Sequence, residues 1–494
     1  MWIGTDNGIS MLKQDGRSFL NYKHNAAYAS SLSSNLIYAI FKEPNGKIWI
    51  GTEQGLNILN PSTGKFTRVD INHRNQYSIV GKAVKSILID PQGIYWVATV
   101  RGGINKYDKH LPFFNLRQSD KLSADGSNAS VITSFVQDGK DDVYAGADGG
   151  GLYLFNMGSG ISKHIPIDNA GESRGLSILA MEKLGSQIWI GTYLDGVFVF
   201  DTKSRNVTQL KATQSGNSIS GNDIFCIRKD SHNNIWIGTN GQGVDCFNPS
   251  SKTFLHFDKN QTGRQRLPIN GYIRTIEEDK EGNIWIGSSG SGIAVYNPIS
   301  GITKVLNKGN SKLPNDNVSS ICVSNNGAVW VGTAGEGFAL FDPNSNKFVA
   351  YSERNGLANG VIYKIIEDNA GILWISTNKG ISSFDPRTQK IKNYSYYNGL
   401  QRNPFVLGAG LKLTDGRIFF GGTDGFNYFS PEKMQSGKSV PKVVLTDLKI
   451  SNKSVIPFEG AEITEHISIA REIHLDYKQN FSLSFAALDY TSPH

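Results

Sequence analysis

The stretch Gly46-Lys47-Ile48-Trp49-Ile50-Gly51-Thr52, followed by Gly55 and Leu56, sets the pattern of the whole chain. It places a tryptophan between aliphatic residues, with a glycine-containing turn on each side. All eight tryptophans occupy this one position, at Trp2, Trp49, Trp96, Trp189, Trp236, Trp285, Trp330 and Trp374. Tyr144 and Phe419 replace the tryptophan in two further copies, so the motif occurs ten times.

Successive copies lie 44 to 49 residues apart, a period typical of four-stranded propeller blades. Each copy then forms one small antiparallel sheet whose two faces are covered by its neighbours. The tryptophan is predicted to fill the wedge between adjacent sheets. The glycines are predicted to serve turn positions that need a positive φ. The fold class expected is all-β.

The second copy shows how the strands of one blade follow each other. An apolar run from 36 to 41 predicts the inner strand A, and Ile48 to Thr52 predicts strand B. Residues 56–59 predict strand C, which ends at Asn60-Pro61 because proline cannot continue a ladder. Residues 66–69 predict strand D.

The last copy, centred on Phe419, runs into Ser430-Pro431-Glu432 without a strand D of its own. Residues Phe113 to Arg117 have the strand D pattern, so we predict that they supply the outermost strand of that blade. This closes a ring of seven blades and removes exposed sheet edges. The predicted domains are three last blades of a first propeller at 1–110 and a complete seven-bladed propeller at 111–434.

Beyond Pro441 the repeat stops and alternating apolar residues continue. Val443 to Ile450, Glu472 to Leu475 and Asn480 to Ala486 are predicted to be strands of a β-sandwich. Residues 441–494 are therefore expected to be the N-terminal part of an immunoglobulin-like domain that is truncated here.

Composition agrees with short strands joined by tight turns, with 54 glycines and only 19% charged residues. The net charge of +7 is spread along the chain, so no nucleic-acid partner is expected.

Cys226 and Cys246 are predicted on non-neighbouring strands of one blade, and with Cys322 they are expected to be small buried residues. No apolar stretch is long enough to span a membrane. Met1 stands in mid-repeat, so we expect a piece of a longer precursor, whose N-terminus cannot indicate localisation.

The blades resemble the two-component regulator propeller family, through the Trp-Ile-Gly-Thr motif and the segment from Ser31 to Asn35. The residues from Phe419 to Met434 resemble that family's last blade, and residues 441–494 resemble the start of its three-tyrosine immunoglobulin-like domain. The resemblance implies the periplasmic sensor region of a hybrid histidine kinase. Such a region binds an oligosaccharide and relays the signal through the β-sandwich to a transmembrane kinase. We expect a homodimer through the full-length protein, with membrane contact only through a C-terminal region beyond this sequence.

No nucleophile elbow, zinc-protease motif or phosphate-binding loop occurs in a suitable context, so no catalytic residue, metal or cofactor is predicted and the segment is not expected to be an enzyme. The acidic pairs in Glu277-Glu278-Asp279 and Glu367-Asp368 are interpreted as groups that solvate a turn. Two alternatives stay open. One is a protein-interaction or dimerisation propeller without a sugar ligand, and the weaker one is a propeller-fold lyase.

Ligand binding is predicted on one face of the ring, where the D-to-A and B-to-C connections converge around the channel. Aromatic faces and planar polar groups suit sugars. The candidates on these connections are Asp148, Arg174, Tyr193, Asp195, Asn222, Tyr272, Arg274, Asn359, Asn403 and Phe405. Asn222 and Asn359 also suit turn geometry.

Overall fold

A computed structural model of the protein describes residues 1–69, 78–90, 93–108, 114–118, 131–167, 175–214, 216–402, 404–434 and 442–488. The chain separates into two compact units. One is Pro112–Gln435, and the other combines Met1–Leu111 with Ser436–His494.

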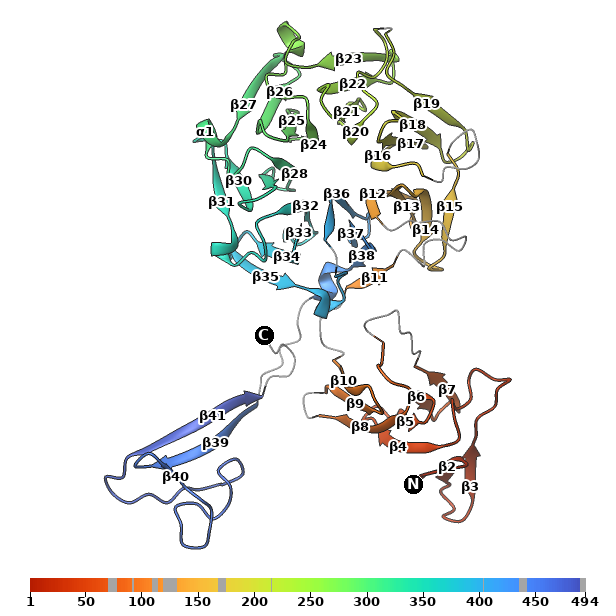
Figure 1. The fold of residues 1–494 in the computed structure, drawn as a ribbon, viewed down its shortest axis with the longest axis vertical. Coiled ribbons are helices and arrows are strands. Elements are labelled where there is room, and N and C mark those ends of the chain that lie inside the picture. Colours follow the sequence, from red (N-terminus) through yellow and green to blue (C-terminus); the bar gives the residue numbers. More distant parts are fainter. Residues whose placement is uncertain are drawn as a thin grey trace. The chain divides into compact units, whose positions relative to one another are not determined.

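Within the described residues from 114 to 434, seven four-stranded antiparallel sheets stand around a central axis as propeller blades (Figure 1). The fold class is confirmed as all-β. Blades 1 to 3 consist of β12 (Val131–Asp138), β13 (Asp142–Asp148), β14 (Gly151–Asn156) and β15 (Ser162–Ile165); β16 (Ile178–Leu184), β17 (Gln187–Thr192), β18 (Val197–Asp201) and β19 (Val207–Leu210); and β20 (Ile224–Lys229), β21 (Ile235–Thr239), β22 (Val244–Asn248) and β23 (Thr253–Phe257). Blades 4 to 6 consist of β24 (Ile273–Glu278), β25 (Ile284–Ser288), β26 (Ile293–Asn297) and β27 (Ile302–Leu306); β28 (Val318–Val323), β29 (Val329–Thr333), β30 (Phe338–Asp342) and β31 (Lys347–Tyr351); and β32 (Ile362–Glu367), β33 (Leu373–Thr377), β34 (Gly380–Asp385) and β35 (Lys390–Tyr394).

Blade 7 joins the two ends of the ring. It combines β36 (Phe405–Lys412), β37 (Ile418–Gly422) and β38 (Gly425–Phe429) with β11 (Asn115–Arg117), which pairs antiparallel with β38. Phe114, fully buried, packs its ring 4.5 Å from that of Phe429. The pairing confirms the predicted closing strand for residues 115–117, whereas Phe113 lies outside the described residues.

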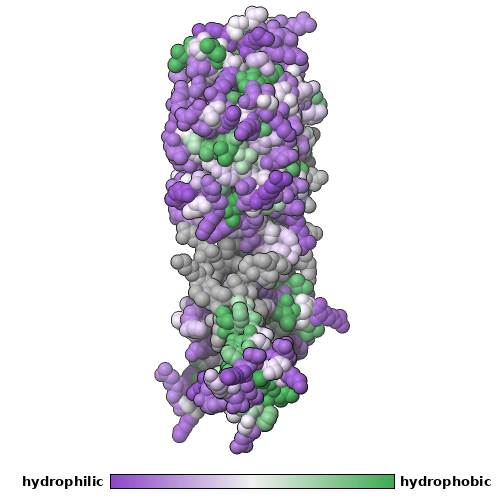
Figure 2. All heavy atoms as spheres, turned by 90° about the vertical axis from the view of Figure 1, so that its left-hand side faces the viewer, coloured by the Kyte–Doolittle hydropathy of each residue, from purple (hydrophilic) through white to green (hydrophobic). Residues whose placement is uncertain are grey.

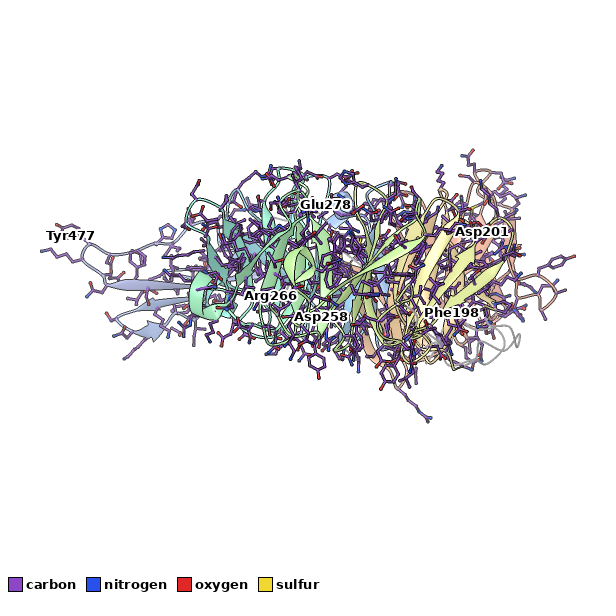
Figure 3. The ribbon with its side chains drawn as sticks, turned by 90° about the horizontal axis from the view of Figure 1, so that it is seen from above. Phe198, Asp201, Asp258, Arg266, Glu278 and Tyr477 are labelled. Carbon is purple, nitrogen blue, oxygen red and sulfur yellow. The ribbon has the colours of Figure 1, made fainter. Side chains whose placement is uncertain are left out.

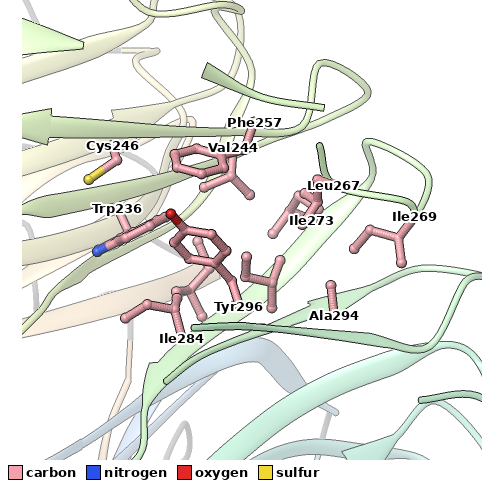
Figure 4. Packing of buried hydrophobic residues seen from close by; sticks show 12 residues of the cluster. Trp236, Val244, Cys246, Phe257, Leu267, Ile269, Ile273, Ile284, Ala294 and Tyr296 are labelled. Carbon is pink, nitrogen blue, oxygen red and sulfur yellow. The ribbon is translucent and has the colours of Figure 1, made fainter. Parts of the chain in front are cut away.

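The regular recurrence of the motif produces one type of contact between neighbouring blades. In Figure 4, Trp236 of blade 3 packs among side chains of its own blade and of blade 4. Its ring centroid lies 5.3 Å from that of Phe257 and 6.0 Å from that of Tyr296 in the next blade. The prediction that the tryptophan fills the wedge between sheets is therefore confirmed.

The second glycine of the motif has a different role from the one predicted. Gly238 has no positive φ, but a Cβ added there would lie 2.7 Å from Cγ2 of Ile273 in the next blade. Its lack of a side chain thus permits close approach of two sheets. Turn glycines such as Gly243, at φ 86°, do adopt the predicted left-handed conformation.

The two faces of the propeller carry different connections. Figure 3 shows Glu278, at the end of a strand A, on the opposite face from Asp258 and Arg266 of a D-to-A connection. Short helical turns follow the outer strands of blades 3 to 6, namely η2 (Gly263–Gln265), α1 (Lys308–Ser311), η3 (Glu353–Asn355) and η4 (Tyr396–Asn398), and η5 (Pro431–Met434) follows β38 of blade 7. The rim visible in Figure 2 is mainly hydrophilic, and its apolar spots are small and separate.

Residues 1–108 form three further sheets of the same type. These are β1 (Trp2–Thr5), β2 (Gly8–Leu12) and β3 (Phe19–Tyr22); β4 (Ile37–Lys42), β5 (Ile48–Thr52), β6 (Gly55–Asn60) and β7 (Lys65–Arg68); and β8 (Val84–Ile89), β9 (Tyr95–Thr99) and β10 (Gly103–Tyr107). The four strands predicted for the second copy agree with β4 to β7 to within one residue at each end.

Residues 442–488 form a sheet of β40 (Lys453–Ser454), β39 (Lys442–Ile450) and β41 (Phe481–Leu488), in that order. Leu448 packs with Ile463 and Ile467 on one face of it. The predicted strands at 443–450 and 480–486 are confirmed, but the one at 472–475 is wrong. There, the His474 amide donates to the Glu462 carbonyl at 2.9 Å, and within residues 442–488 no strand runs alongside to extend this contact into a ladder.

Candidate ligand-binding site

The innermost strands of the blades line a channel along the propeller axis (Figure 1). A cavity of about 300 Å³ occupies it, lined by strand A residues of blades 1 to 4 and 7 together with Lys364 of blade 6. Because strand A runs from the D-to-A face to the opposite face, the first residues of each strand lie at one mouth of the channel. We call this the D–A mouth.

A β-bulge interrupts the first residues of strand A in every blade. In blades 1 to 6 the pairing with strand B skips one residue, namely Thr133, Leu179, Phe225, Arg274, Ser319 and Tyr363. In blade 7 the skip extends from Phe405 to Gly410. A bulge leaves a residue unpaired and redirects its side chain, so this position escapes the strict alternation of a strand. Four of these residues line the cavity, namely Thr133, Leu179, Phe225 and Arg274.

The connections at the D–A mouth are tied together by backbone pairing. The residue after strand B of one blade pairs with the residue before strand A of the next, as Asn240 does with Tyr272 and Ser289 with Asn317. The Ser289 amide also donates to the Tyr272 carbonyl at 2.8 Å. Side chains at the mouth are therefore held by a fixed frame rather than by free loops.

Four residues of blades 3 and 4 form one group at this mouth, which we call the Arg274 cluster: Phe225, Asn240, Tyr272 and Arg274. The Arg274 guanidinium lies over the Phe225 ring, 4.3 Å from its centroid, and donates to Asn240 Oδ1 at 3.1 Å. It also donates to the Ile273 carbonyl at 3.1 Å. Burial lowers the pKa of Arg274, which indicates incomplete compensation of its charge. The Tyr272 side chain is 49% exposed and lies beside Gly241.

A second charged group lies toward the other end of the channel. Arg228 binds Glu277 at 2.8 Å and Glu182 at 3.6 Å, which links blades 2, 3 and 4. All three residues stand opposite the motif tryptophan of their blades. The charge of Glu277 is the main cause that raises the pKa of Arg228. From the sequence, the acidic run that contains Glu277 is interpreted as groups that solvate a turn. That interpretation is wrong for Glu277, whose carboxylate neutralises Arg228 in the channel.

Of the predicted site residues, Tyr272 and Arg274 lie together in the Arg274 cluster. Tyr193 follows strand B of blade 2, and Asp148 is the last residue of strand B of blade 1. Both correspond in their blades to Asn240 in blade 3, and both are exposed. These four residues are the part of the predicted set that the structure places at the D–A mouth.

Three other candidates hold the surrounding loops. Asn222 Oδ1 accepts the Ala212 amide at 2.8 Å, and Asn359 Oδ1 accepts the Val361 amide at 3.1 Å. Asp195 lies 3.5 Å from Lys211 Nζ. For the two asparagines the turn role considered from the sequence is thus present.

The remaining candidates do not contribute to the mouth. Phe405 is 3% exposed and packs against Phe420 in the core, so its ring offers no face to a ligand. The sequence placed it in a connection, but it is the first residue of β36. Arg174 and Asn403 lie outside the described residues.

Sequence reasoning missed Phe225, Asn240 and Lys364, and it missed the channel position of Cys226. Phe225 and Cys226 stand in an apolar strand, where they were indistinguishable from core residues; both are half-buried and line the cavity. Cys322 is also only half-buried, which corrects the expectation for these two cysteines. All three cysteines are free, and β21 separates Cys226 from Cys246 as predicted. One usable signal existed, because Lys364 is a charged residue in the middle of an apolar strand A.

Five segments of the chain match the two component regulator propeller family: residues 31–54, 218–241, 267–290, 312–335 and 356–379. Each matched segment includes the strand A and strand B of one blade. These blades are two-component regulator propeller repeats. The matched repeats include blades 3 and 4, which carry the Arg274 cluster, and blade 6, which carries Lys364.

Two relatives place the propeller repeats in their wider setting. The extracellular domain of the hybrid two component system BT3049 from B. thetaiotaomicron is 25% identical, with a TM-score of 0.70 over 99% of this chain and 68% of that one. "Histidine kinase P4" from Formosa agariphila is 26% identical over 400 residues. That match covers 78% of this chain but only 28% of the kinase, so the chain spans about a quarter of that relative's length. Both likenesses support a sensor role.

In the part of the chain that the structure describes, no helix has the length and apolar character needed to cross a bilayer.

Proposed function

We propose that this chain is part of the extracytoplasmic, ligand-sensing region of a two-component system, and that its propeller binds an oligosaccharide at the D–A mouth. Binding is passed through the sheet of β39 to β41 toward a membrane-bound histidine kinase. The segment itself senses and does not catalyse, and its partners are the sugar and a second copy of the full-length protein. The similarity to the extracellular domain of a hybrid two-component system supports the location.

The observation that carries the sugar proposal is the Arg274 cluster. An exposed tyrosine ring, an amide and a guanidinium stand within one small group at the entrance of a cavity. A pyranose has an apolar face that stacks on an aromatic ring and hydroxyl pairs that bond to planar polar groups. The backbone pairing of Asn240 with Tyr272 holds these groups in place, which lowers the entropy cost of binding.

Isothermal titration calorimetry of the full chain against plant, host and microbial oligosaccharides tests this proposal. Tyr272→Ala removes an exposed ring and is expected to weaken binding about tenfold, or about 1.4 kcal/mol. Tyr397→Ala is the matched control, because Tyr397 is 58% exposed but lies in η4 after the outer strand of blade 6. It is expected to leave binding unchanged.

Two results would overturn the proposal. One is the absence of heat from every glycan with folded protein. The other is an equal loss of affinity in both tyrosine variants. If no glycan binds and light scattering shows self-association, the propeller is an interaction module instead. Turnover of a bound glycan would favour the lyase alternative.

A further inference from the structure

Positively charged side chains outnumber negatively charged ones along the channel. Four cationic side chains line the cavity, namely Lys183, Arg228, Arg274 and Lys364, against two carboxylates, Glu182 and Glu277. Lys183 is bound by Asp138 at 2.6 Å, and Arg228 is bound by both glutamates. Among the described residues, Arg274 and Lys364 have no carboxylate within ion-pair distance. The two cations therefore lack internal counter-ions.

Both unpaired cations line the same cavity of about 300 Å³, together with Cys226. Burial raises the pKa of Cys226 to about 12, the positive charges of Arg274 and Lys364 lower it, and the charge of Glu277 adds to the rise. Arg274 enters the cavity from blade 4 and Lys364 from blade 6, with Cys226 in blade 3.

Both cations are held in place by neighbouring groups. A Cβ added to Gly410 of blade 7 would lie 2.9 Å from Cγ of Lys364, so this glycine leaves room for the lysine stem. Arg274 is fixed by the Phe225 ring, Asn240 and the Ile273 carbonyl. Those two hydrogen bonds use two of its five N–H groups, which leaves three to donate to a ligand.

We propose that Arg274 and Lys364 together bind the negatively charged group of a sugar, a uronate carboxylate or a sulfate ester, inside the D–A mouth. This inference rests on the proposed function and narrows its ligand to acidic oligosaccharides. A guanidinium recognises such a planar or tetrahedral oxyanion through paired N–H bonds, and an ammonium adds a point charge. The cavity of about 300 Å³ is at the lower end of small-molecule sites, which favours entry of a single charged sugar unit.

Calorimetry with paired ligands tests the proposal on the full chain. One pair is a short oligogalacturonate and its methyl ester, and the other is a sulfated galactan oligosaccharide and its desulfated form. The charged member of at least one pair is expected to bind at least tenfold more tightly than its neutral counterpart, and the preferred pair identifies carboxylate or sulfate. This preference is expected to shrink as ionic strength rises, because salt screens the attraction.

Lys364→Met keeps the apolar stem and removes the charge, and it is expected to weaken binding of the charged ligand about tenfold while sparing the neutral one. Arg274→Gln is a second variant with the same expected direction. Lys229→Met is the control, since Lys229 ends strand A of blade 3 and is not among the residues that line the cavity. Thermal unfolding of each variant establishes that it is folded.

Equal affinity for charged and neutral partners would overturn the anion site while leaving oligosaccharide sensing in place. Preference for the charged ligand that survives in both Lys364→Met and Arg274→Gln would also overturn it, because the anion would then bind elsewhere. Failure of every glycan, charged or neutral, would remove the proposed function together with this inference.

Discussion

The indole Nε1 of Trp285 donates to Oδ2 of Asp279, six residues upstream, at 2.7 Å. Asp279 is 8% exposed and also accepts the amides of Glu281 and Asn283, so one carboxylate closes the A-to-B turn and anchors the tryptophan. The same six-residue pair recurs as Asp90–Trp96, Asp230–Trp236 and Asp368–Trp374, with Glu43–Trp49 as a glutamate version. From the sequence, Asp279 and Asp368 are interpreted as groups that solvate a turn, but both are buried and each accepts a tryptophan N–H.

Trp285→Phe is expected to destabilise the propeller more than Trp189→Phe, by about 1–3 kcal/mol. Both tryptophans are 3% exposed, but the Trp189 Nε1 has no hydrogen-bond partner among the described residues. Only the first substitution leaves a buried carboxylate short of a donor. Urea unfolding followed by circular dichroism compares the two variants, and equal losses would contradict the role of the carboxylate.

Phe114→Ala is expected to lower the free energy of unfolding by about 3–5 kcal/mol, because it leaves a cavity under the closing strand. The Phe114 ring packs against Phe429, Tyr394 and Trp374, at centroid distances of 4.5, 5.3 and 6.3 Å. Leu255→Ala, at a 49% exposed position on the outer strand of blade 3, is the control and is expected to change stability by less than about 0.5 kcal/mol. Chemical denaturation measures both.

Gly332→Ala is expected to cost about 1–3 kcal/mol through overpacking between blades 5 and 6. The added Cβ would lie 2.6 Å from Cγ2 of Ile362, which is itself fully buried. Gly158→Ala is the control, because its nearest neighbour, Asn156 Oδ1, is 3.5 Å away and its φ is not positive. If differential scanning calorimetry gave both variants the same melting temperature, the motif glycine would not be required for blade contact.

The His256–Asp245 pair is expected to make the stability of blade 3 depend on pH. Asp245 Oδ1 lies 2.7 Å from His256 Nδ1, and its hydrogen bond is the main cause that raises the pKa of the histidine. A raised folded-state pKa contributes stability that is fully present below the unfolded value, about 6.5, and is lost as pH rises through the folded value. The melting temperature should therefore fall between mildly acidic and alkaline pH.

His256→Gln should flatten that part of the pH profile, whereas His232→Gln should not. His232 is exposed in the A-to-B turn of the same blade and, among the described residues, makes no ion pair. Melting curves of the three proteins from pH 5 to 9 check this. An unchanged slope in His256→Gln would assign the pH dependence to another group.

Much of the fold could be predicted because every copy of the motif has the same packing and turn requirements. The repeated aromatic position, a tryptophan in five blades and Tyr144 or Phe419 in the other two, located strand B in every blade. The missing outer strand of the last copy pointed to residues 113–117, of which 115–117 form β11. The strand predicted at 472–475 failed because alternation of apolar residues records burial but not the presence of a pairing partner. The motif glycine was misjudged because close approach between sheets depends on the neighbouring blade.

The candidate site was predictable only in part. The rule that D-to-A and B-to-C connections meet at one mouth led to Tyr272 and Arg274, which the structure does bring together. Phe225 was missed because a bulge, invisible in the sequence, redirects its side chain toward the channel. Lys364 is identified as unpaired only once the ion pairs of its neighbours are known.

The hydrogen bond from Asn115 Nδ2 to the Tyr428 carbonyl spans 313 positions of the chain. At about 5–20 residues per second, a ribosome needs roughly 15–60 s to make the intervening polypeptide. During that interval the short segment β11 has no partner, while six complete blades accumulate behind it. Closure of the ring must therefore wait until the last blade is translated. A chaperone that shields nascent β-strand edges would act on the incomplete propeller.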